Sequence, residues 1–289
     1  MTKHPLSTIS KNLVSSTNLL QDSKMDWEYV TVPVTVEYDG TSIPTEQLAL
    51  VDPRTKECMR VFTHAYHHIS NKTFLALAKT VEMQLDAQLT YAACVKSCQI
   101  AVLEFPNQAV ASVMFGVRDV TPALVFTNDL ATGSLEVKGL ALTDNVAWPL
   151  LVNDCPPSVN FSHRKKFYVE KSARVVTAFA ELFIERACFE LEYLSSEFVR
   201  VPFIVIKEAL AAANYSTIGG HYDNRYEAMR KYFKNLETDR PSKLQMCIAL
   251  FSTFTQNADN AEHTVLANVS GAILTRKSTC YKYVRDKGA

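Results

Sequence analysis

Glycine is scarce in this chain of 289 residues, which contains only eight. Nucleotide-binding loops and exposed catalytic loops usually need glycine, because it allows positive φ angles and close backbone approach. The common phosphate-binding, dinucleotide-binding, zinc-protease and nucleophile-elbow motifs are also missing from the sequence. These absences weigh against an enzyme, and we expect a protein without catalytic residues and without a cofactor.

The chain has no continuous apolar run of about 18 residues, so nothing in it predicts a transmembrane helix. Its first 25 residues are rich in Ser, Thr, Asn and Lys and lack the apolar stretch of a secretory signal. Seven cysteines without framework spacing indicate reduced thiols rather than a set of disulfides. We therefore expect a cytoplasmic or nuclear protein. Apolar residues make up 47% of the chain, which is enough for a sizeable core.

The formal net charge is zero, but the charges are unevenly distributed along the chain. Residues 1–163 hold 11 Lys and Arg against 16 Asp and Glu, a net charge of −5. Residues 164–289 hold 19 basic and 14 acidic residues, a net charge of +5. The basic half is the candidate for contact with nucleic acid or an anionic surface. The alternative is two domains that differ only in surface charge.

Residues 1–25 are predicted to be a flexible arm, and residues 26–163 a β-rich domain. The segment 27–38 alternates apolar and polar residues, which predicts a half-buried strand with one apolar face formed by Val30, Val32, Val34 and Val36. Pro33 cannot donate a ladder hydrogen bond, so this strand should lie at a sheet edge or carry a bulge. Asp39 and Gly40 predict a turn after it.

The segment 73–98 fits both a helical and a strand pattern, and its length favours a helix. Short apolar runs at regular spacing follow, and they suggest a sandwich or barrel rather than alternating β/α units. Beyond about residue 165 the period becomes helical. One long helix should bury a stripe formed by Val176, Phe179, Phe183, Ala187 and Leu191. The predicted fold class is α+β, a β-rich barrel-like or sandwich-like region followed by an α-helical domain with a basic tail, residues 164–289.

Cysteine and histidine residues are numerous enough to raise the question of a metal or catalytic site. A zinc site needs four ligands in closed geometry. One group of candidate ligands is three histidines near Cys58, namely His64, His67 and His68. The other is the Cys-x3-Cys pair of Cys94 and Cys98, which would share one face of a helix. No second pair with zinc spacing follows, so we expect core thiols, surface histidines and no metal. A hydrolase built from Cys155 and His163 stays open as the enzyme alternative.

Basic residues alternate with aromatic residues in two stretches of the second half. Cations can follow phosphates while aromatic rings stack on single-stranded bases. The predicted nucleic-acid-binding residues are Arg164, Lys165, Lys166, Arg225, Tyr226, Arg230, Lys231 and Lys234. The alternative is an amphipathic helix surface whose rings pack inward and whose charges are simply solvated.

Asp52 ends a short apolar run in the sequence LALVDPR. Asp is a preferred first residue and Pro a preferred second residue of a type I turn. Asp52 is therefore predicted to have a structural role.

The order of elements in this sequence is an apolar strand that ends in Asp52, further strands, and then helices after KKFYVEKSARVV. This order resembles the thirty-kilodalton superfamily of plant-virus cell-to-cell movement proteins. The resemblance spans about residues 27–200. It implies a non-enzymatic viral protein that binds single-stranded RNA or a viral ribonucleoprotein and forms homo-oligomers. It also implies peripheral contact with a membrane or contact with a host protein, and a location in the host cytoplasm, at plasmodesmata or in the nucleus. The second hypothesis is a viral nucleocapsid or matrix protein that oligomerises and binds RNA.

Overall fold

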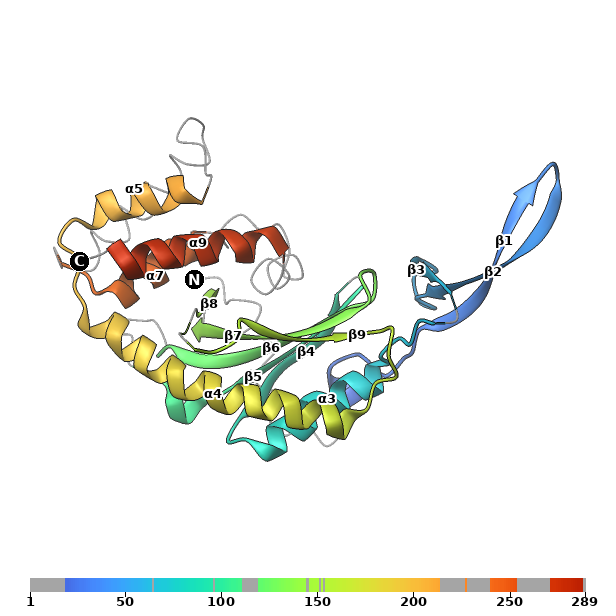
Figure 1. Cartoon of the computed structure of the whole chain (residues 1–289), viewed down its shortest axis with the longest axis horizontal. Coiled ribbons are helices and arrows are strands. Elements are labelled where there is room, and N and C mark those ends of the chain that lie inside the picture. Colours follow the sequence, from blue (N-terminus) through green and yellow to red (C-terminus); the bar gives the residue numbers. More distant parts are fainter. Residues whose placement is uncertain are drawn as a thin grey trace.

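The computed structural model describes residues 19–63, 65–95, 97–110, 119–143, 146–150, 152, 154–213, 227, 240–253 and 271–287, with the backbone alone for 271–274 and 287. The molecule is elongated. A body of one β-sheet with helices makes up most of it, and a β-arm projects from one end (Figure 1). None of the described helices combines the length and the apolar character needed to cross a bilayer.

The body contains a six-stranded antiparallel sheet. Five strands follow the chain order β4-β5-β6-β7-β8, and β9 pairs with β7. Their bounds are β4 (Gln88–Val95), β5 (Cys98–Glu104), β6 (Thr121–Asp129), β7 (Ser134–Thr143), β8 (Val146–Pro149) and β9 (Ser158–Ser162). β9 pairs with residues 134–138 of β7 and β8 with residues 140–143. The two short strands therefore share one long edge of β7.

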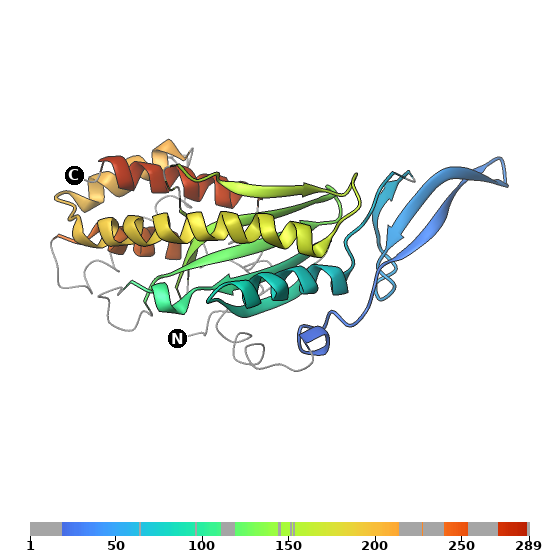
Figure 2. The same cartoon turned by 60° about the horizontal axis from the view of Figure 1, so that its bottom comes forward.

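Helices pack on one face and at one end of this sheet. The described helices are α2 (Leu19–Asp22), α3 (Asn71–Gln84), α4 (Val169–Ser196), α5 (Pro202–Ala212), α7 (Lys243–Ser252) and α9 (Gly271–Lys287), with a short 3-10 helix, η2, at Pro106–Gln108. α3 and α4 lie side by side on the sheet (Figure 2). α7 and α9 pack against β8 at the end of the body opposite the arm.

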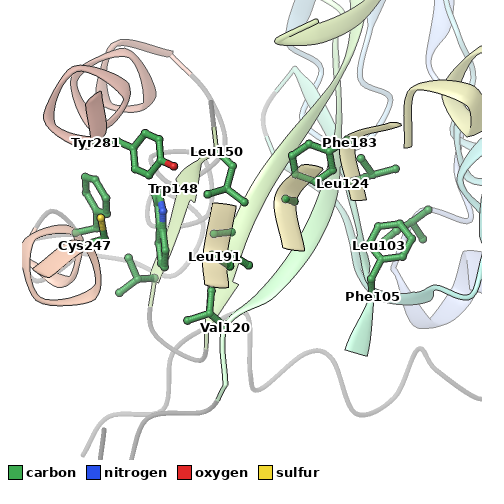
Figure 3. Packing of buried hydrophobic residues seen from close by; sticks show 14 of the residues in the cluster. Leu103, Phe105, Val120, Leu124, Trp148, Leu150, Phe183, Leu191, Cys247 and Tyr281 are labelled. Atoms are coloured by element: carbon green, nitrogen blue, oxygen red, sulfur yellow. The ribbon is translucent and has the colours of Figure 1, made fainter. Parts of the chain in front are cut away.

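The main hydrophobic core joins the sheet to both groups of helices. Trp148 of β8 is fully buried, and its ring stacks on Phe251 of α7 with 5.6 Å between the centroids. Figure 3 shows Trp148 beside Tyr281 of α9 and Cys247 of α7. The predicted β-rich and helical segments thus contribute to one common core.

The long helix predicted from its apolar stripe is confirmed as α4. All five residues of that stripe are buried against the sheet. Gly139 of β7 makes this packing close, because a Cβ atom at Gly139 would overlap the ring of Phe183. Pro202 is the first residue of α5, where proline fits because the first helical residue needs no N–H partner.

The other face of the body sheet carries a second apolar cluster. Its described members all belong to strands of the sheet, and among them are Tyr91, Ile100, Val125 and Leu142. These side chains are buried. Both faces of the sheet are therefore apolar, which explains why β5 and β6 each carry a continuous apolar run, 100–103 and 123–126, rather than an alternation.

The arm is a separate three-stranded antiparallel sheet of β1 (Val30–Tyr38), β2 (Thr41–Val51) and β3 (Cys58–Phe62). β1 is an edge strand with a register shift between Pro33 and Thr35, as the proline predicted. Asp39 and Gly40 form the turn with φ angles of 47° and 72°. The expected burial of β1 is wrong. Its valine face is exposed, because the arm extends beyond the body (Figure 1).

The predicted α+β class is confirmed, with sheets in the first two-thirds of the chain and helices after them. The barrel-like expectation is wrong, since both sheets formed by the described strands are open. The ambiguous segment 73–98 contains both structures: most of α3 and then β4, which ends at Val95. Cys94 and Cys98 consequently lie on paired strands, not on one helix face.

The predicted flexible arm at residues 1–25 extends too far. Residues 1–18 lie outside the described part of the chain, but α2 occupies residues 19–22 and contacts α3. Met25 is fully buried in the main core. Residues 19–25 therefore belong to the folded body, because they supply apolar contacts to α3.

Candidate nucleic-acid interface

A turn and a helix start place basic residues together at the end of the body nearest the arm. β9 ends at Ser162, and the chain turns there: Arg164 N donates to Ser162 Oγ at 3.2 Å and Lys165 N to Ser162 O at 3.3 Å. The ring of Phe167 then meets Phe161 edge to face, with 5.7 Å between centroids. This apolar contact fixes the short link from β9 to α4.

Between β9 and the first turns of α4 lies a groove of about 570 Å³, which we call the β9–α4 groove. It combines lysine side chains with aromatic and small polar ones. Its lining residues are Asn160, Phe161, Ser162, Lys165, Lys166, Phe167, Tyr168, Lys171, Ser172 and Val175. The segment 160–175 holds five Lys and Arg and one acidic residue, so the groove and its rim are strongly positive.

Two further features favour an anionic ligand in the β9–α4 groove. Tyr168 is the N-cap of α4 and makes no side-chain capping bond, so first-turn backbone N–H groups lack that partner. The dipole of this 28-residue helix adds partial positive charge at the same end. Lys166 Nζ lies 5.6 Å from the centre of the Tyr168 ring, which leaves an exposed aromatic face beside a cation.

The structure brings some of the predicted binding residues together. Lys165 and Lys166 line the groove, and Arg164 is exposed in the adjoining turn. Arg225, Tyr226, Arg230, Lys231 and Lys234 lie outside the described residues, so their part of the prediction stays a prediction.

The groove also contains residues that the sequence prediction did not name as binding residues. Lys171 lines it from one helical turn beyond Tyr168, and Val175 lies one turn further. Their spacing of three to four residues was a usable signal, because such residues share one helix face. Asn160 and Ser162 come from β9, and only the packing of β9 beside α4 places them there.

A chain of buried polar side chains holds the start of this basic turn. His163 Nε2 bonds to Asn128 Oδ1 at 2.7 Å, Asn128 Nδ2 donates to Gln99 Oε1 at 2.5 Å, and Gln99 Nε2 donates to Asn71 Oδ1 at 2.6 Å. Asn71 Nδ2 in turn donates to the carbonyl oxygen of Trp27. The chain therefore connects β9, the central strands and α3.

The direction of these hydrogen bonds determines which ring nitrogen of His163 carries the proton. Because Asn128 uses its amide nitrogen toward Gln99, its oxygen must accept, and His163 Nε2 carries the proton. His163 Nδ1 lies 2.8 Å from Tyr66 Oη. Burial lowers the pKa of His163 to about 4, so the ring is neutral at pH 7 and Nδ1 accepts from Tyr66. The same burial raises the pKa of Tyr66 to about 12, which keeps its proton in place.

Asp52 lies at the base of the arm, after β2, and is buried. Its two carboxylate oxygens accept from Arg54: the backbone N at 2.8 Å and Nε at 3.1 Å to Oδ1, and Nη2 at 2.8 Å to Oδ2. These hydrogen bonds, above all those from the Arg54 side chain, lower the pKa of Asp52. The Arg54 guanidinium lies 3.5 Å above the ring of Trp27. Asp52 thus ties a turn to the segment that precedes β1.

The catalytic and metal alternatives find no assembled site in the described part of the chain. Both ring nitrogens of His163 are used by Tyr66 and Asn128, and Cys155 lines a different pocket between β7 and α9. Burial raises the pKa of the Cys155 thiol, the opposite of an activated nucleophile. Among the described residues, no three His, Cys, Asp or Glu side chains are grouped to hold a metal ion.

Comparison of the chain with protein families, with curated proteins and with solved structures found no match in any of the three. The resemblance to plant-virus movement proteins is therefore not tested by these comparisons and stays a hypothesis.

Proposed function

We propose that the protein binds single-stranded nucleic acid, without catalysis, through the β9–α4 groove. One observation carries this proposal: three lysines, an exposed tyrosine and an uncapped helix N-terminus converge on a single groove of about 570 Å³. Lysines and helix N-termini favour phosphate oxygens, while an exposed ring provides a stacking surface for an unpaired base.

The residue types in the groove favour binding with little sequence preference. Lys165, Lys166 and Lys171 are point charges that suit phosphates rather than the bidentate reading of a base edge. Stacking on Tyr168 would accept any base, because every base has an aromatic face. RNA within a ribonucleoprotein is the ligand that binding without sequence preference implies.

Transport of viral RNA between cells is the biological role that goes with this activity, with homo-oligomers and contacts to membrane or host proteins. The protein would then act in the host cytoplasm, at plasmodesmata or in the nucleus. A nucleocapsid is the second candidate, and a specific observation favours it: the arm of β1, β2 and β3 projects away from the body and exposes an apolar face. Projecting arms are suited to joining subunits along RNA.

The salt dependence of binding tests the proposal directly. The affinity for a single-stranded homopolymer should fall with salt, with a slope of roughly −0.7 per phosphate neutralised. Replacing Lys165 and Lys166 by Ala should reduce the magnitude of that slope by about 1.4, since two cations are removed. The matched control replaces Lys79 and Lys138, which pair with Glu82 and Glu136, do not line the groove and should leave the slope unchanged.

Salt-independent binding, or no binding at low ionic strength, would remove the nucleic-acid proposal. Equal slopes for both double variants would place the binding surface outside the β9–α4 groove. Electron microscopy with RNA separates the two biological roles, because a nucleocapsid should form regular rings or helices. A movement protein should instead form irregular RNA-coated filaments.

A further inference from the structure

Alternate residues of β9 direct their backbone groups away from the body sheet. Among the described strands β9 pairs only with β7. His163, just after β9, donates its backbone N–H to the carbonyl oxygen of Gly133, just before β7, at 3.0 Å. Because backbone groups alternate in direction along a strand, Asn160 and Ser162 direct theirs toward the free edge of β9. Both residues are exposed and line the β9–α4 groove.

The oxygens of these two residues differ in what they bind. Ser162 Oγ accepts from Arg164 N at 3.2 Å, and the carbonyl oxygen of Ser162 accepts from Lys165 N at 3.3 Å. The side chain of Asn160 donates through Nδ2 to Ser158 Oγ at 2.9 Å, which orients its amide group. No residue in the described part of the chain donates to Asn160 Oδ1. This oxygen is therefore an acceptor that a ligand of the groove can use.

Asn160 Oδ1 is of the opposite kind to the phosphate-binding groups of the groove. Lys165, Lys166 and Lys171 are cationic donors, and the first backbone N–H groups of α4 are donors too. Phosphate oxygens in a nucleic acid can only accept hydrogen bonds. A phosphodiester group can therefore satisfy the lysines but not Asn160 Oδ1.

One part of a polynucleotide can give Asn160 Oδ1 a hydrogen bond without a preference for sequence. The 2′-hydroxyl group of ribose is a donor at every nucleotide of RNA, and DNA lacks it. Bases also carry donors, but these differ from base to base. An acceptor that binds the 2′-hydroxyl group consequently selects RNA and leaves the choice of bases open.

We propose that the β9–α4 groove selects RNA over DNA, with Asn160 Oδ1 as the acceptor for a ribose 2′-hydroxyl group. This inference rests on the nucleic-acid binding proposed above and names its substrate class. The three lysines bind phosphates of either nucleic acid, and Tyr168 stacks on a base of either. DNA covers Asn160 without donating to it, so Oδ1 loses water and gains no partner. That penalty falls on DNA alone.

β9 holds Asn160 in position before a ligand arrives. Asn160 lies opposite Glu136 of β7 in the antiparallel ladder. Beyond the end of the strand, both ring nitrogens of His163 are bonded, to Tyr66 and to Asn128. A group that is already ordered loses little entropy on binding, so its hydrogen bond contributes to selectivity.

Three oligouridylates of one length that differ only at the 2′ position test the proposal. They are the ribose, the deoxyribose and the 2′-fluoro forms; fluorine keeps the sugar pucker of RNA but cannot donate a hydrogen bond. Fluorescence anisotropy at one salt concentration should show the ribose form binding about tenfold more tightly than either of the others. The salt slopes of the three forms should be equal, because each neutralises the same number of cations.

Asn160→Leu assigns the effect to one side chain. The change removes Oδ1 at similar side-chain size and at an exposed position, so the fold should be retained. The affinity for the ribose form should fall about tenfold, to that of the deoxyribose form, and the affinity for the deoxyribose form should not fall. Asn107→Leu makes the same change at an exposed position that does not line the groove, and this control should keep the preference for ribose.

Equal affinities of the wild-type protein for the ribose and deoxyribose forms would overturn this inference and leave the nucleic-acid proposal intact. A preference that the 2′-fluoro form shares would overturn it as well, because the shape of the sugar and not its hydroxyl group would then be recognised. The same holds for a preference that survives in Asn160→Leu. If none of the three forms binds at low ionic strength, the nucleic-acid proposal itself is wrong, and this inference with it.

Discussion

Gly139 of β7 lies directly beneath the ring of Phe183 of α4, in a space where a Cβ atom would overlap the ring. Gly139→Ala should therefore force α4 away from the sheet or Phe183 out of its position. Overpacking of this kind typically costs about 1–3 kcal/mol. Denaturant unfolding of the variant checks this, with the midpoint expected to fall at an unchanged slope.

Gly40 provides the comparison for this measurement. It has a positive φ of 72° in the arm turn, but nothing lies within 4 Å of an added Cβ. Gly40→Ala should cost only the backbone preference, about 1 kcal/mol. If Gly139→Ala were as stable as the wild type, the close packing of α4 on β7 would be wrong.

His163 should make stability depend on pH between about 6.5 and 4. Its pKa is about 4 in the folded protein because of burial, while the unfolded chain has the ordinary value near 6.5. Between pH 6.5 and 4 the imidazole of His163 is protonated in the unfolded chain but not in the folded protein. The free energy of unfolding therefore falls as pH decreases through this range and levels off below pH 4. The total loss should be about 3 kcal/mol.

The variant His163→Gln isolates this effect, since neighbouring groups titrate too. Burial also lowers the pKa of His68, while Arg60 and Asp129 influence the charge of His163. The free energy of unfolding should be measured at several pH values for both proteins. The curves should converge as pH falls toward 4. Parallel curves would mean that His163 titrates normally in the folded protein.

Asp52→Ala should lower the free energy of unfolding by about 0.5–2 kcal/mol, through loss of its hydrogen bonds to Arg54. Arg54 is half-exposed, so no buried charge is left behind. The exposed Glu46→Ala serves as the control and should change stability little. A variant that kept its stability but lost nucleic-acid binding would show that Asp52 acts in binding and not in the fold.

Tyr168→Ala should weaken binding of single-stranded RNA by about 1–3 kcal/mol, if one base stacks on the ring. The salt slope should stay the same, because no cation is removed. Fluorescence anisotropy at several salt concentrations measures both quantities. Tyr38→Ala, which removes an exposed tyrosine at the tip of the arm, is the matched control. Equal losses for the two variants would speak against stacking in the groove.

Much of the secondary structure follows from short-range chemistry. Pro33 interrupts the ladder of an edge strand wherever that strand lies, because it lacks an N–H. Pro202 can begin α5 but could not lie inside it, and the stripe from Val176 to Leu191 has helical spacing in any surroundings. Lys165 and Lys166 are predicted to bind because the sequence itself shows adjacent basic and aromatic residues, and the structure places both in the groove.

The segment 73–98 and the groove residues of β9 needed long-range contacts. Leucine and alanine in α3 fit more than one pattern, and the packing of α3 on the body sheet decides between them. Asn160 and Ser162 enter the groove only because β9 pairs with β7, from which β8 separates it along the chain. Such pairing is a property of the whole sheet.

The valines of β1 show most clearly which features follow from the sequence and which from the tertiary structure. Their alternation was sufficient to determine a strand and to place Val30, Val32 and Val36 on one face, because side chains alternate along every strand. Whether that face is buried was decided by the tertiary structure alone. Most of β1 is exposed on both faces because the arm extends beyond the body, which covers only the base of the arm, where Leu50 packs with Leu130. An apolar pattern predicts which residues can be buried together. The surface that buries them depends on contacts between distant parts of the chain, or between chains.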